Sequence, residues 1–164
     1  MRATVEEVTE QPPATADDLH RELAIRLFNE TWRLIEKAER SSDDEVAMLL
    51  SAMASRWHWG QVGGGSEAAT GDWLISHVSC LVGMGDLALR FARASLTLAE
   101  SEGWDGWRLA SAHEGMARAC AVSGDPGGRA RHLTAAGSAL EREPSPEDRE
   151  AISEQLSTVP NPAT

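Results

Sequence analysis

The 164-residue sequence predicts an all-α fold of about seven helices arranged as antiparallel hairpins. One reason is that apolar residues recur at three- and four-residue spacing along most of the chain, which places them on one face of a helix. A second reason is that residues typical of helix starts and ends separate these stretches. A third is that no segment longer than four residues alternates between apolar and polar side chains, as a half-buried strand does.

The first two predicted helices form one hairpin. Asp17 and Asp18 are suited to cap a helix of about six turns, whose apolar stripe consists of Leu19, Leu23, Leu27, Thr31, Leu34 and Ala38. The segment Ser41–Asp44 interrupts this pattern, and a second apolar stripe then runs from Val46 to Trp57. The segment Gly60–Ser66 contains four glycines, so we expect a flexible connection there rather than a helix.

Five further helices and two flexible ends complete the predicted chain. The helices are expected from between Glu67 and Asp72 to Gly83, from Asp86 to Ser101, from Asp105 to just before Gly124, from Arg129 to Glu141, and from Pro146 to Thr158. Residues 1–15 contain two prolines and no periodicity and are expected to be a flexible arm, and residues 159–164 a flexible tail. A chain of this length corresponds to about one domain, which we place at residues 16–158.

Two of the predicted hairpins repeat one another. A shift of 40 residues places Cys80 on Cys120 and Val82 on Val122. A unit of this length, made of two antiparallel helices, resembles tetratricopeptide-like (TPR-like) repeats. The second-helix pattern of those repeats is carried by Ala88, Phe91, Ser95, Leu96 and Leu98. The resemblance implies a short TPR-like superhelix of stacked hairpins, in which the last helix caps an exposed apolar face.

Three segments carry a more specific resemblance. They are Ser55–Gly60 (SRWHWG), Gly71–Val78 (GDWLISHV) and Ala112–Ala119 (AHEGMARA). Together they are similar to a group of small bacterial TPR-like proteins, with His77 at a position where that group has arginine. The resemblance implies an architecture and carries no activity with it.

The charge balance and the hydropathy exclude several classes of partner. Fifteen Lys and Arg against 26 Asp and Glu give a net charge of −11, whereas nucleic-acid binding needs a basic face. No stretch approaches the ~20 apolar residues of a membrane span, and the first residues lack the apolar core of a signal peptide. We therefore expect a cytoplasmic protein that binds neither nucleic acid nor membranes.

The sequence predicts neither a metal site nor a cofactor. The histidines and acidic residues show no HExxH or Glu-x-x-His spacing, and the two cysteines show no CxxC spacing. Cys80 and Cys120 are interpreted as small packing residues where helices cross. The glycines after Gly60 lack the Gly-Lys-Ser/Thr ending of a phosphate-binding loop.

The tryptophans are the first indication of function. Five of the six lie between residues 57 and 107, and the segment 51–100 is nearly neutral, with four acidic and three basic residues. Arg56, His58 and Trp59 are expected at the end of a helix, where they either cap it or form the wall of a pocket. Ser76 and His77 follow Trp73 by one turn, so His77 is either a core histidine or a groove residue.

Glu114 and Arg118 are spaced for an ion pair along one helix. This pair lies either on the surface or in the concave groove of the repeats. In the groove, Glu114 and His113 would act as general acid and base, and Arg118 would hold an anion.

Three functions remain as hypotheses. The first is a binding module whose concave groove holds a peptide or partner helix, with the ligand-binding residues Arg56, Trp59, Trp73, Ser76, His77, Trp107 and Arg118. The second is a small enzyme or a binder of a small organic molecule, with His58, His113 and Glu114 as acid and base groups and Arg56 and Arg118 as anion anchors. The third is a subunit that forms a homodimer through an apolar helix face.

Overall fold

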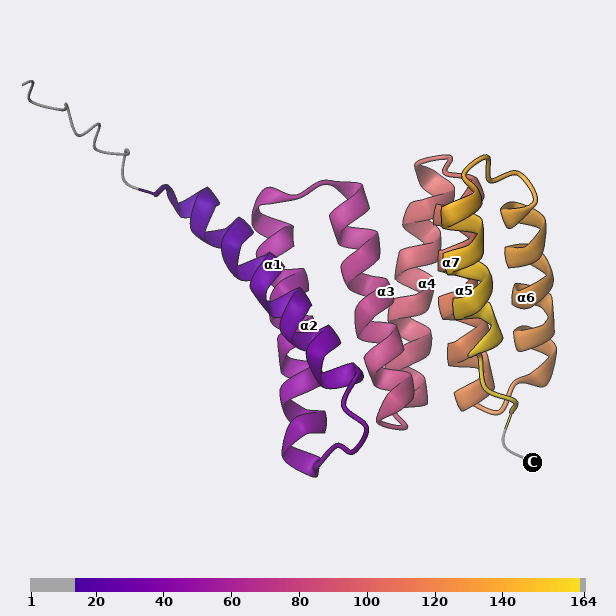
Figure 1. Cartoon of the computed structure of the whole chain (residues 1–164), viewed down its shortest axis with the longest axis horizontal. Coiled ribbons are helices and arrows are strands. Elements are labelled where there is room, and N and C mark those ends of the chain that lie inside the picture. Colours follow the sequence, from indigo (N-terminus) through magenta and orange to yellow (C-terminus); the bar gives the residue numbers. More distant parts are fainter. Residues whose placement is uncertain (1–13, 163–164) are drawn as a thin grey trace, which may run out of the picture.

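The computed structural model describes residues 14–162, which form seven helices and no strand. The helices are α1 (Ala16–Ile35), α2 (Ser42–Val62), α3 (Gly65–Leu81), α4 (Gly85–Ser101), α5 (Gly106–Val122), α6 (Pro126–Leu140) and α7 (Pro146–Ser157). Consecutive helices pack against one another, and the chain advances from α1 and α2 at one end of the molecule to α6 at the other, with α7 lying beside α5 (Figure 1). The prediction of an all-α protein built from helical hairpins is confirmed.

Side chains at the N-termini fix where several helices begin. Thr15 and Ser41 each accept a hydrogen bond from the backbone N–H three residues later, and the carboxylates of Asp18 and Asp44 each accept one from the capping residue's N–H. These two capping boxes satisfy backbone donors that the helix itself leaves unpaired. At α7, Ser145 caps the first turn and Pro146 occupies its first position.

The predicted flexible connection over Gly60–Ser66 is wrong. α2 continues to Val62 and α3 begins at Gly65, so only two residues join them. The Gly63 N–H donates to the Trp59 carbonyl over 2.7 Å, and the Gly64 N–H donates to the Glu67 carboxylate over 2.9 Å. A Cβ on Gly63 would lie 2.8 Å from the Trp59 carbonyl oxygen, so this tight turn requires glycine.

The repeat in the chain is 41 residues long rather than 40. Both ends of α5 lie 41 residues after the corresponding ends of α3, and α6 begins 41 residues after α4. Gly83 and Gly124 occupy the same place after α3 and α5, with φ of 74° and 73°. The alignment of Cys80 with Cys120 is therefore displaced by one residue, and Ser79 is the counterpart of Cys120.

Small residues allow the helices to approach closely in the core. Between α4 and α5 the buried residues are Ala88, Ala92, Leu96, Ala99, Ala112, Met116, Ala119 and Cys120. A second cluster joins α1, α2 and α3 around Leu34, Met48 and Leu74. A third joins α5, α6 and α7 around Ala136, Leu140 and Ile152, so α7 covers an apolar face of the last hairpin.

The structure describes only part of the two chain ends that were expected to be flexible. Residues 1–13 of the expected arm lie outside the described residues, as do residues 163–164 of the expected tail. The first residue of the expected tail, Val159, is only 5% exposed, and Arg129 donates hydrogen bonds to the carbonyls of Val159 and Pro160. Within the described part of the chain, no helix combines the length and the apolar character that crossing a membrane needs.

Candidate functional site

A cavity of about 220 Å³ is lined by residues of α1, α3, α4, α5 and α7. Four of the six tryptophans line it: Trp32 of α1, Trp73 of α3, Trp104 before α5, and Trp107 in the first turn of α5. Arg108, Ile152 and Gln155 also line it, and small residues of α3, α4 and α5 form the rest of its wall. We call this site the Trp cavity.

The repeat explains why these residues meet. Trp32, Trp73, Glu114 and Gln155 follow one another at intervals of 41 residues and lie on α1, α3, α5 and α7. Corresponding positions of stacked repeats face the same side of the molecule. Trp32, Trp73 and Gln155 line the Trp cavity, and Glu114 is bonded to Trp73 beneath it.

The tryptophan rings form two groups within the cavity. The rings of Trp32 and Trp73 are stacked, with centroids 6.1 Å apart and an interplanar angle of 24°. On the other side, the Arg108 guanidinium lies 5.3 Å from the Trp104 ring centroid and 5.4 Å from that of Trp107. Trp107 is 38% exposed, so this second group forms the rim. The cavity thus offers aromatic walls with one cation at its mouth.

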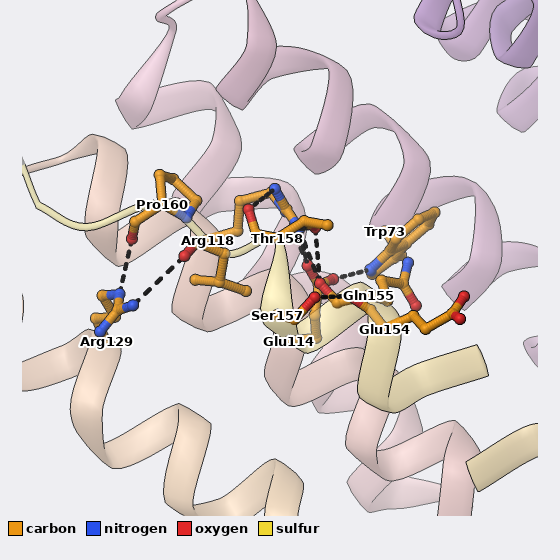
Figure 2. Close-up of polar contacts among 10 residues, drawn as sticks. Trp73, Glu114, Arg118, Arg129, Glu154, Gln155, Ser157, Thr158 and Pro160 are labelled. Atoms are coloured by element: carbon orange, nitrogen blue, oxygen red, sulfur yellow. Dashed lines mark hydrogen bonds and ion pairs between the residues drawn. The ribbon is translucent and has the colours of Figure 1, made fainter. Parts of the chain in front are cut away.

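A buried ion pair lies beneath the cavity (Figure 2). The Trp73 Nε1–H donates to Glu114 Oε2 over 2.9 Å, and Arg118 donates to Glu114 Oε1 from Nε over 2.8 Å. Glu114 has no exposed surface and Arg118 is 5% exposed. Gly115 makes room for this arrangement, because a Cβ there would lie 2.9 Å from Trp73 Cδ1. Of the two alternatives for Glu114 and Arg118, the surface pair is therefore wrong.

Arg118 also holds the end of α7. Its Nη2 donates to the Thr158 hydroxyl over 2.7 Å and to the Gln155 carbonyl over 3.4 Å, and Nη1 donates to the Thr158 carbonyl over 3.2 Å (Figure 2). A cation at this place complements the negative end of the helix dipole. Burial raises the pKa of Glu114, and the charge of Arg118 and the hydrogen bond from Trp73 oppose that rise. The bonds of the pair are thus directed at protein groups rather than into the cavity.

His77 is buried beside the stacked tryptophans. Its ring centroid lies 5.1 Å from that of Trp73 and 6.0 Å from that of Trp32, and the side chain is 8% exposed. Burial, with a smaller contribution from Arg118, lowers the pKa of His77 to about 3. Its Nδ1 has no hydrogen-bond partner, and the neighbouring Ser76 donates to the Ala88 carbonyl over 2.9 Å. His77 thus packs against two wall residues of the Trp cavity, and neither His77 nor Ser76 lines it.

The two remaining acid–base candidates pair with other histidines. His58 Nδ1 lies 2.8 Å from Nδ1 of His20 on α1, and His113 Nδ1 lies 3.1 Å from Nδ1 of His132 on α6. Burial and the neighbouring histidine lower the pKa of both His58 and His113. Neither residue lines the Trp cavity, so His58, His113 and Glu114 do not converge there.

Arg56 and Trp59 lie at a different place from the Trp cavity. Arg56 Nε donates to Asp72 Oδ1 over 2.7 Å, within a half-buried ion pair. Trp59 lines a second hollow of about 280 Å³ together with Ile25 and Phe28 of α1, and Arg21 lies 5.9 Å from its ring centroid. Of the ligand-binding residues predicted from the sequence, Trp73 and Trp107 line the Trp cavity.

The lining residues that were not among the predicted site residues include Trp32, Trp104 and Arg108. The signal that identifies Trp32 is its distance of 41 residues from Trp73, which becomes meaningful once the repeat length is known. The predicted helices place Trp104 and Arg108 at the start of the fifth helix, next to Trp107. A search for clustered aromatic and basic residues at that helix start would have found them.

No cluster of three or more metal-binding side chains occurs within residues 14–162. Cys80 and Cys120 are both free thiols, half-buried and buried respectively. Comparisons with protein-family models, curated protein sequences and solved structures found no significant match. The function must therefore be argued from the residues of this chain.

Proposed function

We propose that this chain is a TPR-like binding module whose Trp cavity holds an apolar or aromatic side chain of a peptide or partner helix. The observation that carries the proposal is a cavity of about 220 Å³ lined by four tryptophans. Large aromatic side chains dominate binding hot spots because they bury much apolar area in a fixed shape.

The size of the cavity favours one anchoring side chain over a larger ligand. Small-molecule sites occupy roughly 300–1,000 Å³, which is more than the Trp cavity provides. The half-exposed Trp107 and Arg108 at its mouth offer further contacts to the chain on either side of the anchor. A small ring compound of suitable size is the alternative ligand for the same site.

A selection from a random peptide library tests the proposal. The wild-type protein is expected to enrich peptides that share one large apolar or aromatic residue. Ser111 lines the cavity, so Ser111→Phe should fill part of it and weaken the selected peptides at least tenfold, or ~1.4 kcal/mol. The matched control is Ser138→Phe, at an exposed position of α6 outside the cavity.

Two results would contradict the proposal. One is a selection that enriches no shared residue. The other is a set of peptides that bind both the wild type and a folded Ser111→Phe variant equally. Circular dichroism and the thermal unfolding midpoint of both variants establish that a loss of binding does not come from unfolding.

A further inference from the structure

Helix α2 carries apolar side chains on two opposite faces. Its inner face packs into the core through Met48 and Ala52, both with no exposed surface. Its outer face carries Val46, Leu50 and Trp57, which are 58%, 62% and 58% exposed. A surface helix of a monomer normally presents polar residues to solvent. Within residues 14–162 these three side chains stay more than half exposed, with the His20 ring centroid 5.5 Å from that of Trp57.

Six positions along the outer face, Leu50 and Trp57 among them, follow a coiled-coil spacing. Asp43, Ala47, Leu50, Ala54, Trp57 and Gln61 are separated alternately by four and three residues. This spacing is that of the a and d positions through which two helices interlock. We call these six residues the α2 seam. It spans about 27 Å at the helical rise per residue.

The seam is complementary to itself when two copies run antiparallel. In the register centred on Ala52, Leu50 of one copy faces Ala54 of the other, and Trp57 faces Ala47. Each large side chain then meets a small one, as close packing requires. At the ends, the carboxylate of Asp43 meets the amide of Gln61 of the second copy.

The charges of α2 favour the same orientation. Its first turn carries Asp43, Asp44 and Glu45, and no acidic residue follows until Glu67. An antiparallel pair keeps the two acidic first turns apart, whereas a parallel pair would place them side by side.

We propose that two copies of this chain form an antiparallel dimer through the α2 seam. The interface is isologous, since the same residues contribute from both copies. One helix pair lies at the low end of specific interfaces in area, so the dissociation constant is expected in the micromolar range. None of the residues that line the Trp cavity belongs to α2, so the dimer does not depend on the proposed binding function.

Analytical ultracentrifugation with charge substitutions tests the dimer. At concentrations well above the dissociation constant the wild type should sediment with about twice its mass of 17.7 kDa. Leu50→Glu and Ala54→Lys should each sediment as monomers, and their equimolar mixture should regain the dimer because position 50 of one copy faces position 54 of the other, where the opposite charges attract. Met84→Glu, at another exposed apolar residue, is the matched control and should remain dimeric.

Each contrary result overturns the proposal. These results are a wild type that stays monomeric at all concentrations, a Met84→Glu variant that dissociates like Leu50→Glu, and a mixture that stays monomeric. The orientation is tested by mixing Asp43→Cys with Gln61→Cys under oxidation, which should form a disulfide between the two variants. A disulfide formed instead by Gln61→Cys alone would show a parallel pair.

Discussion

The carboxylate of Glu114 determines how single substitutions beneath the Trp cavity should behave. It has no exposed surface, and its two oxygens accept hydrogen bonds from Trp73 and Arg118. Removing one member of a buried ion pair leaves the other charge without compensation in a medium of low dielectric constant. The loss is then larger than the contribution of the pair itself.

Glu114→Ala should therefore lower the free energy of unfolding by about 3–5 kcal/mol. Urea titration followed by circular dichroism measures this change. The control is Arg33→Ala, which breaks the exposed pair with Glu30 and should change stability little. Equal effects of the two substitutions would show that the Glu114–Arg118 pair is not buried as described.

The buried His77 predicts a dependence of stability on pH. Its pKa is about 3 in the folded protein against 6.5 for an ordinary histidine, so between these values the unfolded chain binds more protons. The stability that the neutral ring provides is complete above pH 6.5 and is lost as pH falls towards 3. His77→Phe keeps a ring beside Trp73 and should remove this component.

Unfolding experiments on the wild type and on His77→Phe across this pH range test the prediction. The difference between the two free energies of unfolding isolates His77, because both proteins share all other titrating groups. The wild type should lose stability relative to the variant as the pH falls. Parallel pH profiles would mean that His77 is accessible to protons in the folded protein.

The Glu114–Arg118 pair shows which property of two residues the sequence predicts and which it does not. The four-residue spacing correctly predicts that the two side chains bond to each other. It does not determine their burial, because the same spacing occurs on exposed and buried helix faces. Burial comes from Trp73 and from the end of α7, each about 41 residues away in the sequence.

At the scale of elements, α7 is held mainly at its C-terminal end. Ile152, 8% exposed, is its one buried residue. Arg118 donates to the carbonyls of Gln155 and Thr158, and Arg129 donates to those of the chain that follows. Helices with few buried contacts open locally at lower free energy than the rest of a protein. The hydrogen bonds that Arg118 and Arg129 donate at the end of α7 should therefore control how fast the amide hydrogens of α7 exchange with solvent.

Arg129→Ala should increase amide hydrogen exchange in α7 by about threefold to tenfold, as expected for the loss of one or two hydrogen bonds. Exchange in α3 and α4 should stay unchanged. Mass spectrometry of exchanged peptides measures both. Arg131→Ala, which removes an exposed side chain 3.9 Å from Asp125, is the control. Faster exchange throughout the chain would contradict a local role for Arg129.

The helices themselves were largely predictable, because their amphipathic patterns and caps are local. The exception is the link between α2 and α3, where four glycines suggested a flexible connection. Glycine lowers helix propensity by about 1 kcal/mol, but packing of the flanking turns can outweigh that cost. In this chain the side chain of Glu67 and the close approach of Gly63 to Trp59 compact the link to two residues.

At the scale of the whole molecule, the Trp cavity depends on the register of the repeat. A shift of 40 residues hides the relation between Trp32, Trp73 and Glu114, and a shift of 41 reveals it. The sequence therefore shows that tryptophans cluster, but it does not show which of them line the cavity. Trp59 was expected in the groove and lies in the second hollow, while Trp32 was missed because it lies in the first helix.

The central claim, that the Trp cavity is the binding site, is tested most directly by fluorine NMR of the protein labelled with 5-fluorotryptophan. The spectrum should contain six tryptophan signals, assigned by single Trp→Phe substitutions. Addition of a peptide selected with the wild type should shift the signals of Trp32, Trp73, Trp104 and Trp107 and leave those of Trp57 and Trp59 in place. Shifts confined to Trp57 or Trp59 would place the peptide elsewhere and contradict the proposed site.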